Sequence, residues 1–354
     1  MPDIKLKNQP FDLDFHPKEP VVFSSLLTGQ VCAWRYDDAT GEITSEWSAR
    51  PSKRTARALS VEQDGDYVWV GGKSGNIFQL SSADGLVARE IAGAHESPVN
   101  RIFCMNPNHI ASGDDEGVIK FWDPREEASI RTYSQHFDYI TDFIYFEDKR
   151  QLVTTSGDGH LSVIDIRSNK AQPLSISDDQ EDELLSIVPI KRGTKAIVGS
   201  GLGVLSIWDR KKGWGDCVDR IPGHPASVDA MVALTPDIVA TGSEDGMIRV
   251  IQILPHKFLG VVATHGDFPI ERIRLDRNAK WLGSISHEEC LKLTDLEDLF
   301  EDSSDEDEEM TNDRVEKSDS DEEKSKKKKS KKDSGMKDMG RSQAEDSFDF
   351  FADL

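Results

Sequence analysis

The segment Ile110-Ala-Ser-Gly-Asp-Asp-Glu-Gly117-Val-Ile-Lys-Phe-Trp122-Asp123 decides the fold, because it is the clearest copy of a unit that recurs along the chain. Apolar residues flank a short acidic turn that ends in glycine, which predicts a strand, a tight turn and a second strand. The segment 238–251 repeats the same order around Gly246. The sequence therefore contains a repeated β-hairpin.

The turn glycine returns at a nearly constant interval. It stands at positions 29, 75, 117, 159, 203 and 246, spaced by 42 to 46 residues, and Glu289 keeps the register in the last copy. In three copies a histidine (His95, His136 and His224) precedes another alternating apolar run, which predicts a further strand. Each unit thus has four short strands, and the pattern predicts an all-β repeat protein.

These residues and this period resemble the WD-repeat β-propeller family. Seven units fit, so the resemblance implies a seven-bladed propeller, which we place at residues 1–299. The seventh unit stops after its third strand, near Leu293. The family usually closes its ring with an N-terminal strand, and Ile4-Lys5-Leu6 can supply it here, removing two open sheet edges.

The resemblance also implies structural roles for the histidines. Each histidine is expected to hydrogen-bond a turn acid and to join it to a Ser, Thr or Trp of the same blade. The expected His/acid pairs are His95 with Glu116, His136 with Asp158, and His224 with Asp245; the hydroxyl partners are Ser112, Thr154 and Thr241, with Trp122 added in the first set. A zinc site is excluded because the three histidines would stand in separate blades.

Composition and the absence of certain motifs exclude several classes of function. The 354 residues carry a net charge of −22, and only 37% are hydrophobic, which indicates that part of the chain does not fold. Four scattered cysteines without a CxxC pair exclude a disulfide scaffold. No phosphate-binding loop, GxSxG or HExxH motif is present, so we expect no catalysis, no cofactor and no small-molecule substrate. The sequence has no run of 18 apolar residues, so we also expect no membrane segment.

The C-terminal segment, residues 300–354, is expected to be a disordered tail with acidic, basic and aromatic blocks. Residues 301–323 hold 13 acids and two bases, with few aliphatic residues to bury. Three functions are predicted within it. They are nuclear or nucleolar targeting by Lys324, Lys326, Lys327, Lys328, Lys329, Lys331 and Lys332, phosphorylation of Ser303, Ser304, Ser318 and Ser320 before acidic residues, and partner docking by Phe348, Phe350 and Phe351.

Loop charges differ between the two faces expected for the propeller. The acidic glycine turns share one face, and the loops of the opposite face are locally basic. The candidate contact residues on this basic face are Arg125, Lys149, Arg150, Arg167, Lys191, Arg192, Arg210, Lys211 and Lys212. We expect them to meet RNA or an acidic partner. Ordinary solvated loop charge is the alternative, since Glu126, Glu127, Glu147 and Asp148 dilute the positive charge.

Segments 177–186, 213–225 and 255–261, together with the tail, resemble the family of WD repeat-containing protein 55 and its fungal counterparts. This resemblance implies a non-catalytic nucleolar scaffold that joins pre-ribosomal particles and acts in ribosomal RNA processing, with particle proteins and ribosomal RNA as partners. A second resemblance leaves an alternative open. Trp122-Asp123-Pro124-Arg125 is similar to the WDxR motif of substrate receptors that bind a cullin-4 ubiquitin ligase adaptor.

Overall fold

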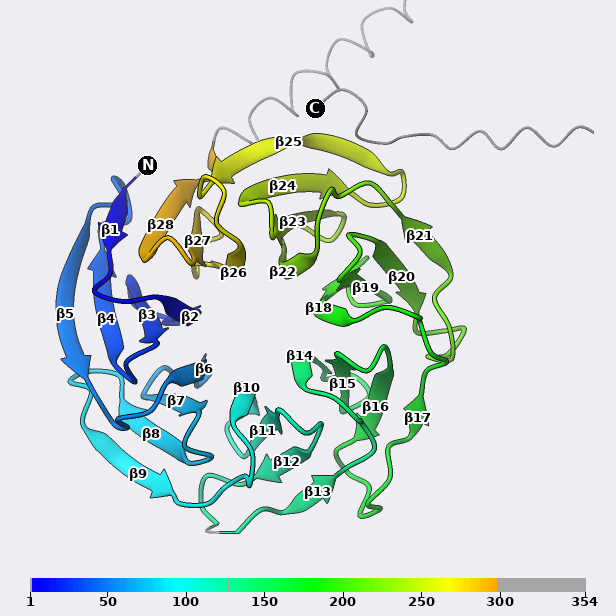
Figure 1. Cartoon of the computed structure of the whole chain (residues 1–354), viewed down its shortest axis with the longest axis horizontal. Coiled ribbons are helices and arrows are strands. Elements are labelled where there is room, and N and C mark those ends of the chain that lie inside the picture. Colours follow the sequence, from blue (N-terminus) through cyan, green and yellow to red (C-terminus); the bar gives the residue numbers. More distant parts are fainter. Residues whose placement is uncertain (1, 127, 298–354) are drawn as a thin grey trace, which may run out of the picture.

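The computed structural model describes residues 2–126 and 128–297. Within these residues, 28 strands form seven four-stranded antiparallel sheets arranged as a ring of blades (Figure 1). The predicted seven-bladed propeller is confirmed.

The blades follow one another along the chain. Blade 1 consists of β2 (Pro10–Phe15), β3 (Val21–Leu26), β4 (Val31–Tyr36) and β5 (Ile43–Ala49), and blade 2 of β6 (Ala56–Val61), β7 (Tyr67–Gly72), β8 (Ile77–Ser81) and β9 (Val87–Ile91). Blade 3 consists of β10 (Val99–Asn106), β11 (His109–Asp114), β12 (Ile119–Trp122) and β13 (Arg131–Tyr133), and blade 4 of β14 (Ile140–Phe146), β15 (Gln151–Ser156), β16 (Leu161–Asp165) and β17 (Ser175–Ile176).

Blade 5 consists of β18 (Leu184–Ile190), β19 (Lys195–Ser200), β20 (Leu205–Asp209) and β21 (Asp219–Ile221), and blade 6 of β22 (Val228–Ala233), β23 (Ile238–Ser243), β24 (Met247–Gln252) and β25 (Lys257–Thr264). Blade 7 consists of β26 (Ile270–Leu275), β27 (Trp281–Ser286) and β28 (Cys290–Asp295), with β1 (Asp3–Lys5) as its outer strand.

The first strand of each blade lies nearest the central axis, and the innermost strands of neighbouring blades contact one another (Figure 1). Because the four strands alternate in direction, the loops between the second and third strands share one face with the loops that connect blades. We call this the glycine-turn face. Loops between the first and second strands, and between the third and fourth, lie on the other face, which we call the opposite face.

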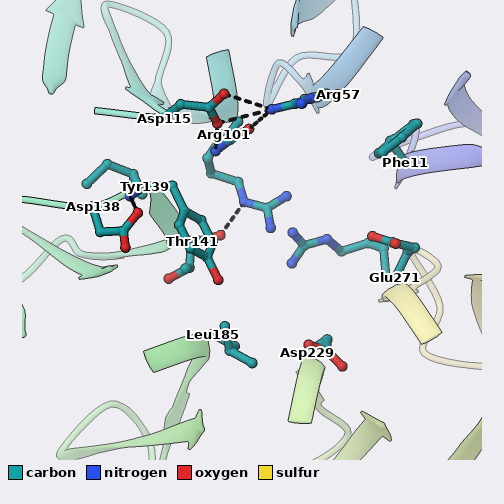
Figure 2. A pocket seen from close by; sticks show the side chains of 13 residues that line it. Phe11, Arg57, Arg101, Asp115, Asp138, Tyr139, Thr141, Leu185, Asp229 and Glu271 are labelled. Carbon is teal, nitrogen blue, oxygen red and sulfur yellow. Dashed lines mark hydrogen bonds and ion pairs between the residues drawn. The ribbon is translucent and has the colours of Figure 1, made fainter. Parts of the chain in front are cut away.

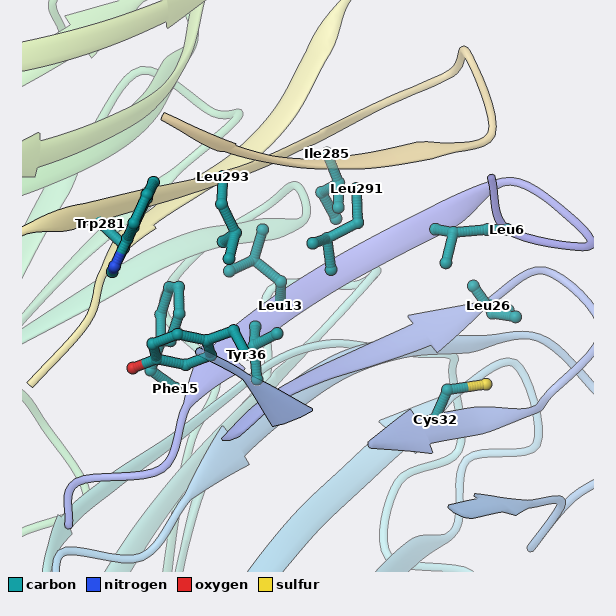
Figure 3. Close-up of a cluster of buried hydrophobic side chains, with 11 residues drawn as sticks. Leu6, Leu13, Phe15, Leu26, Cys32, Tyr36, Trp281, Ile285, Leu291 and Leu293 are labelled. Carbon is teal, nitrogen blue, oxygen red and sulfur yellow. The ribbon is translucent and has the colours of Figure 1, made fainter. Parts of the chain in front are cut away.

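The ring closes as the sequence predicts. Strand β1 pairs with β28, with Ile4 opposite Leu291 and Lys5 opposite Cys290. Beside this joint, Leu13 and Phe15 of blade 1 pack in one buried cluster with Trp281, Leu291 and Leu293 of blade 7 (Figure 3). The cluster removes apolar surface of both blades from water, so the joint is held by side-chain packing as well as by strand pairing.

The six turn glycines that define the repeat all adopt φ between +71° and +80°, and Glu289 of blade 7 adopts +58°. L-residues with a Cβ rarely take this conformation, which explains why glycine recurs there. At Gly203 an added Cβ would also lie 2.5 Å from the carbonyl oxygen of His224 and 2.6 Å from that of Ala226.

Replacing Gly203 by alanine is therefore expected to lower the free energy of unfolding by about 2 kcal/mol, from backbone strain together with the steric clash. Urea denaturation measures the change. Gly215→Ala is the matched control, because a Cβ there meets no atom within 4 Å. Equal effects of the two substitutions would contradict the steric explanation.

Candidate functional site

Blade 3 contains a complete hydrogen-bonded chain of four side chains. The indole nitrogen of Trp122 donates to Ser112 Oγ at 2.8 Å, Ser112 Oγ lies 2.6 Å from His95 Nε2, and His95 Nδ1 lies 2.7 Å from Asp114 Oδ2. The prediction that Glu116 is the acid partner of His95 is wrong, and Glu116 is exposed. Asp114 takes its place because its other oxygen also accepts the backbone N–H of Glu116 and of Val118, which closes the turn.

Blade 4 confirms the pair of His136 with Asp158. The two carboxylate oxygens lie 3.0 and 3.2 Å from His136 Nδ1. Burial opposes ionisation of Asp158, but the hydrogen bond and charge of His136 outweigh it and lower the pKa of this carboxyl to about 2. The prediction that Thr154 is the hydroxyl partner of His136 is wrong, since His136 Nε2 contacts Ser162 Oγ at 2.8 Å.

Blade 6 differs from the expected arrangement at its acid. Thr241 Oγ1 lies 2.9 Å from His224 Nε2, as expected, but the Asp245 carboxylate forms a bidentate ion pair with Arg249 at 3.0 and 2.7 Å. Burial and the Arg249 charge lower the pKa of His224 to about 4. The neighbouring guanidinium thus favours a neutral imidazole.

Blade 7 has a histidine that the sequence analysis missed. His265 Nε2 contacts Ser284 Oγ at 2.8 Å, and its Nδ1 lies 3.1 Å from Glu288 Oε2. The spacing from His224 to His265 is 41 residues, close to the repeat, and could have revealed it. All four histidines are buried and bonded within the fold, which supports the structural role expected for the three that were predicted.

The predicted basic residues do lie in loops of the opposite face, and five of them are exposed without an ion pair to any described residue. These five, which we call the cationic patch, are Lys149, Arg150, Arg192, Lys211 and Lys212. They come from blades 4 and 5, which are neighbours in the ring (Figure 1). The positive charge is therefore concentrated on two adjacent blades.

Two other predicted contact residues hold the blades together. Lys191 Nζ contacts Asp237 at 3.0 Å and the carbonyl oxygen of Leu254 at 3.1 Å, both in blade 6. Arg210 pairs with Asp148 at 2.7 Å, and its guanidinium lies 3.9 Å from the centre of the Phe146 ring, both in blade 4. Because these contacts occupy the two side chains, we leave Lys191 and Arg210 out of the patch.

The WDxR motif has a defined local geometry. Trp122 is buried, while Arg125 folds back onto Asp123 with contacts of 2.8 and 2.5 Å and remains 71% exposed. The hydrogen bond from Arg125 lowers the pKa of Asp123 to about 2. Arg167 pairs with Asp165 in the same way in blade 4, at 2.9 and 2.7 Å.

A pocket of about 450 Å³, missed by sequence analysis, opens at the axis on the glycine-turn face (Figure 2). We call it the mouth. Every blade contributes to its lining through its innermost strand. These lining residues are Phe11, Arg57, Asn100, Arg101, Ile140, Thr141, Leu185, Asp229, Glu271 and Arg272. They are spread over some 260 positions, so no local pattern predicts the mouth.

The mouth has both charges within one pocket. Arg57 donates to Asp115 at 3.0 Å and to Asn100 at 2.8 Å, while Asp229 and Glu271 lie across the pocket (Figure 2). Mixed charges in a concave site suit a polar or charged segment of another macromolecule.

Four charged side chains from blades 1, 3, 4 and 7 form an axial network of ion pairs. Asp12 contacts Arg101 at 3.2 Å and Arg272 at 3.3 Å, and Asp142 contacts Arg272 at 3.5 Å and Arg101 at 3.6 Å. Burial raises the pKa of Asp12 and of Asp142, and the charge of Arg101 acts against it. The network ties separate blades together around the axis.

Asp229, beside the mouth, destabilises the fold when it ionises. Burial raises the pKa of this carboxyl from its ordinary 3.8 to about 6, and the charges of Glu271 and Glu244 add to the shift. Because the pKa is raised on folding, stability is greatest below pH 3.8 and falls as pH rises through 6. Asp229→Asn should remove this decline and raise the free energy of unfolding by about 2 kcal/mol at pH 7.5.

The measurement is denaturation across pH 5 to 8, where the free energy of unfolding of the variant minus that of wild type should grow with pH. Asp237→Asn is the control, since the Asp237 side chain, in the same blade, is half exposed and its surface ion pair with Lys191 contributes at most about 1 kcal/mol. A difference that stays flat across this range would contradict the buried-carboxylate explanation.

The predicted targeting lysines (324–332), phosphorylation sites (303–320) and phenylalanine motif (348–351) lie outside the described residues. Among residues 2–126 and 128–297, no group of three or more His, Cys, Asp or Glu side chains could hold a metal ion. In the same part of the chain, no helix has the length and apolar character needed to cross a membrane.

Comparison with known proteins agrees with the fold. A family model described as WDR55 matches residues 1–299. WD repeat-containing protein JIP5 of Cryptococcus neoformans var. neoformans serotype D is 71% identical over the full length of both chains. WD repeat-containing protein 55 of Arabidopsis thaliana is 36% identical, covering 84% of each chain, and that of Bos taurus is 33% identical, covering 84% of this chain and 77% of its own.

A solved structure, the WD40 β-propeller domain of Doa1, superposes with a TM-score of 0.70 at 15% identity. The superposition covers 83% of this chain and 95% of that one. At this identity the likeness shows the propeller fold alone.

Proposed function

Because the chain belongs to the WDR55 family of WD-repeat propellers, we propose that it is a non-catalytic interaction scaffold of ribosome biogenesis in the nucleolus. It joins pre-ribosomal particles and supports ribosomal RNA processing. The family resemblance supports the nucleolar setting, as do the lysines of segment 324–332.

The observation that carries the RNA-binding side of the proposal is the cationic patch. An acidic chain is a poor general binder of polyphosphate, since such binding depends on several cations that act together. Here five exposed cations gather on two adjacent blades, although the whole chain carries a net charge of −22. A local cluster of this kind allows contact with RNA or with an acidic partner although the chain as a whole is acidic.

The test is a tagged pull-down from cell extract with and without ribonuclease, followed by sucrose-gradient sedimentation and mass spectrometry. Co-sedimentation with pre-ribosomal particles supports the proposal, and loss after ribonuclease treatment shows that RNA holds the complex. A light fraction without ribosomal proteins or assembly factors contradicts it.

A second candidate is the substrate receptor of a cullin-4 ubiquitin ligase. The exposed Arg125 guanidinium, held by Asp123, favours it, because a preorganised side chain loses little freedom on binding. Arg125→Ala is expected to abolish capture of the adaptor under this candidate and to leave particle association unchanged. Such a solvent-exposed ion pair contributes little to stability, so the fold should survive.

Immunoprecipitation with quantitative mass spectrometry measures both outcomes. Arg167→Ala, the equivalent DxR arginine of blade 4, is the matched control. If wild-type protein captures no adaptor, the receptor candidate is wrong.

A further inference from the structure

A second pocket, of about 480 Å³, lies on the opposite face between blades 3 and 4. Two half-buried aromatic side chains line it, Phe103 of β10 and Tyr145 of β14. Its volume lies within the range of small-ligand sites, about 300–1,000 Å³. The pocket therefore has room for a ligand and aromatic groups to contact it.

Polar groups of the turn between β10 and β11 line the same pocket. Asn106, Asn108 and His109 contribute amide and imidazole groups. The side-chain oxygen of Asn106 accepts the backbone N–H of Asn108 at 3.0 Å and lies 3.0 Å from His109 Nδ1. These bonds fix the turn, so its donors and acceptors keep their positions.

One arginine lines the pocket, and the charges of others act on its lining. Arg150 of the cationic patch lines it directly, and its carbonyl oxygen accepts the backbone N–H of Ile166 at 3.1 Å, which fixes the loop. Burial raises the pKa of the Tyr145 hydroxyl, and the charges of Arg150 and Arg167 act against that shift. Burial lowers the pKa of His109; the Asp123 charge acts against this shift, and the charges of Arg131, Arg125 and Arg150 add to it.

We propose that this pocket takes one unpaired nucleobase of a single-stranded RNA whose phosphates cross the cationic patch. The inference rests on the proposed function and adds a specific subsite to it. Aromatic faces stack on bases, and arginines neutralise the adjoining phosphates. The Glu147 carboxylate, also in the lining, accepts a hydrogen bond from an exocyclic amino group. The same carboxylate disfavours an acidic peptide in this position.

The experiment measures fluorescence anisotropy of the full-length chain with two labelled probes. One is a 12-nucleotide single-stranded RNA of mixed sequence, and the other is the same phosphate backbone without bases. The intact RNA is expected to bind about tenfold more tightly, a difference typical of base stacking on an aromatic side chain. Equal affinities would overturn the subsite and leave the electrostatic contact in place, whereas no binding of either probe would contradict RNA contact altogether.

Paired variants locate the subsite. Tyr145→Leu is expected to remove the difference between the probes, and Tyr145→Phe, which keeps the ring, is expected to retain it. Arg150→Glu should weaken the binding of intact RNA more than the binding of the base-free probe. Arg192→Glu is the matched control, because Arg192 occupies the equivalent turn of blade 5, with φ of 54° against 52° for Arg150, and is not part of the pocket lining. Arg192→Glu should weaken the binding of both probes equally.

Two results would overturn the assignment. One is a preference for intact RNA that survives Tyr145→Leu in protein whose circular dichroism is unchanged. The other is Tyr145-dependent binding of an acidic, phenylalanine-containing peptide, with residues 344–354 as the probe, by a chain that binds no RNA. That second result would make the pocket a protein-docking site.

Discussion

Replacing Lys149, Arg192, Lys211 and Lys212 together by glutamate is expected to weaken single-stranded RNA binding about a hundredfold at roughly 0.1 M salt. Each cation that neutralises a phosphate releases condensed counterions, and each glutamate adds repulsion. The slope of log affinity against log salt should therefore also fall. Anisotropy titrations at several salt concentrations measure both quantities.

The control for this variant carries the same change in net charge elsewhere. Lys5, Lys53, Arg54 and Lys73 are exposed, and none of them lies in a loop of the opposite face. Changing all four to glutamate should alter RNA affinity less than threefold, because surface charges beyond about 10 Å are screened at this salt concentration. Equal losses in both variants would show that net charge, and not the cationic patch, governs binding.

Replacing Arg272 by methionine is expected to lower the free energy of unfolding by about 3–5 kcal/mol. Arg272 is 2% exposed, and it contacts both Asp12 and Asp142 in the axial network. Removing it leaves the two buried carboxylates with Arg101 as their contact partner and with the nearby charge of Arg274. Methionine fills much of the space, so the loss reports the missing charge rather than a cavity.

Urea denaturation at pH 7.5 measures this loss. Arg35→Met is the control, because its pairs with Glu19 and Glu46 are solvent-exposed and such pairs contribute at most about 1 kcal/mol. A cost below 1 kcal/mol for Arg272→Met would mean that the network has little effect on the stability of the ring.

The fold could be predicted from the sequence because one backbone requirement repeats. Every blade needs a residue with positive φ between its second and third strands, and glycine satisfies that requirement six times at a nearly constant spacing. The outer position of β1 followed from a missing strand in the last unit. The glycine spacing reflects local chain geometry, which sequence encodes directly, whereas the closure of the ring joins strands far apart in the sequence and followed from the family resemblance.

Side-chain partners were harder to predict. Asp114 and Glu116 stand two positions apart, and only the folded turn shows that Asp114 reaches both His95 and two backbone N–H groups. In blade 6, Arg249, four residues after Asp245, forms an ion pair with the Asp245 carboxylate. The mouth and the axial network could not be predicted at all, because their residues meet only when seven distant strands converge on one axis.

The pairing of β1 with β28 has a consequence for biosynthesis. It joins Lys5 to Cys290, which leave the ribosome 285 residues apart. At about 5–20 residues per second, β1 waits roughly 15 to 60 s for its partner strand. Hairpins form within microseconds, but the buried clusters join neighbouring blades, so the core beside each blade is completed when the next blade emerges. The elongation rate of the ribosome, rather than the folding rate of any blade, therefore sets the time at which the ring closes.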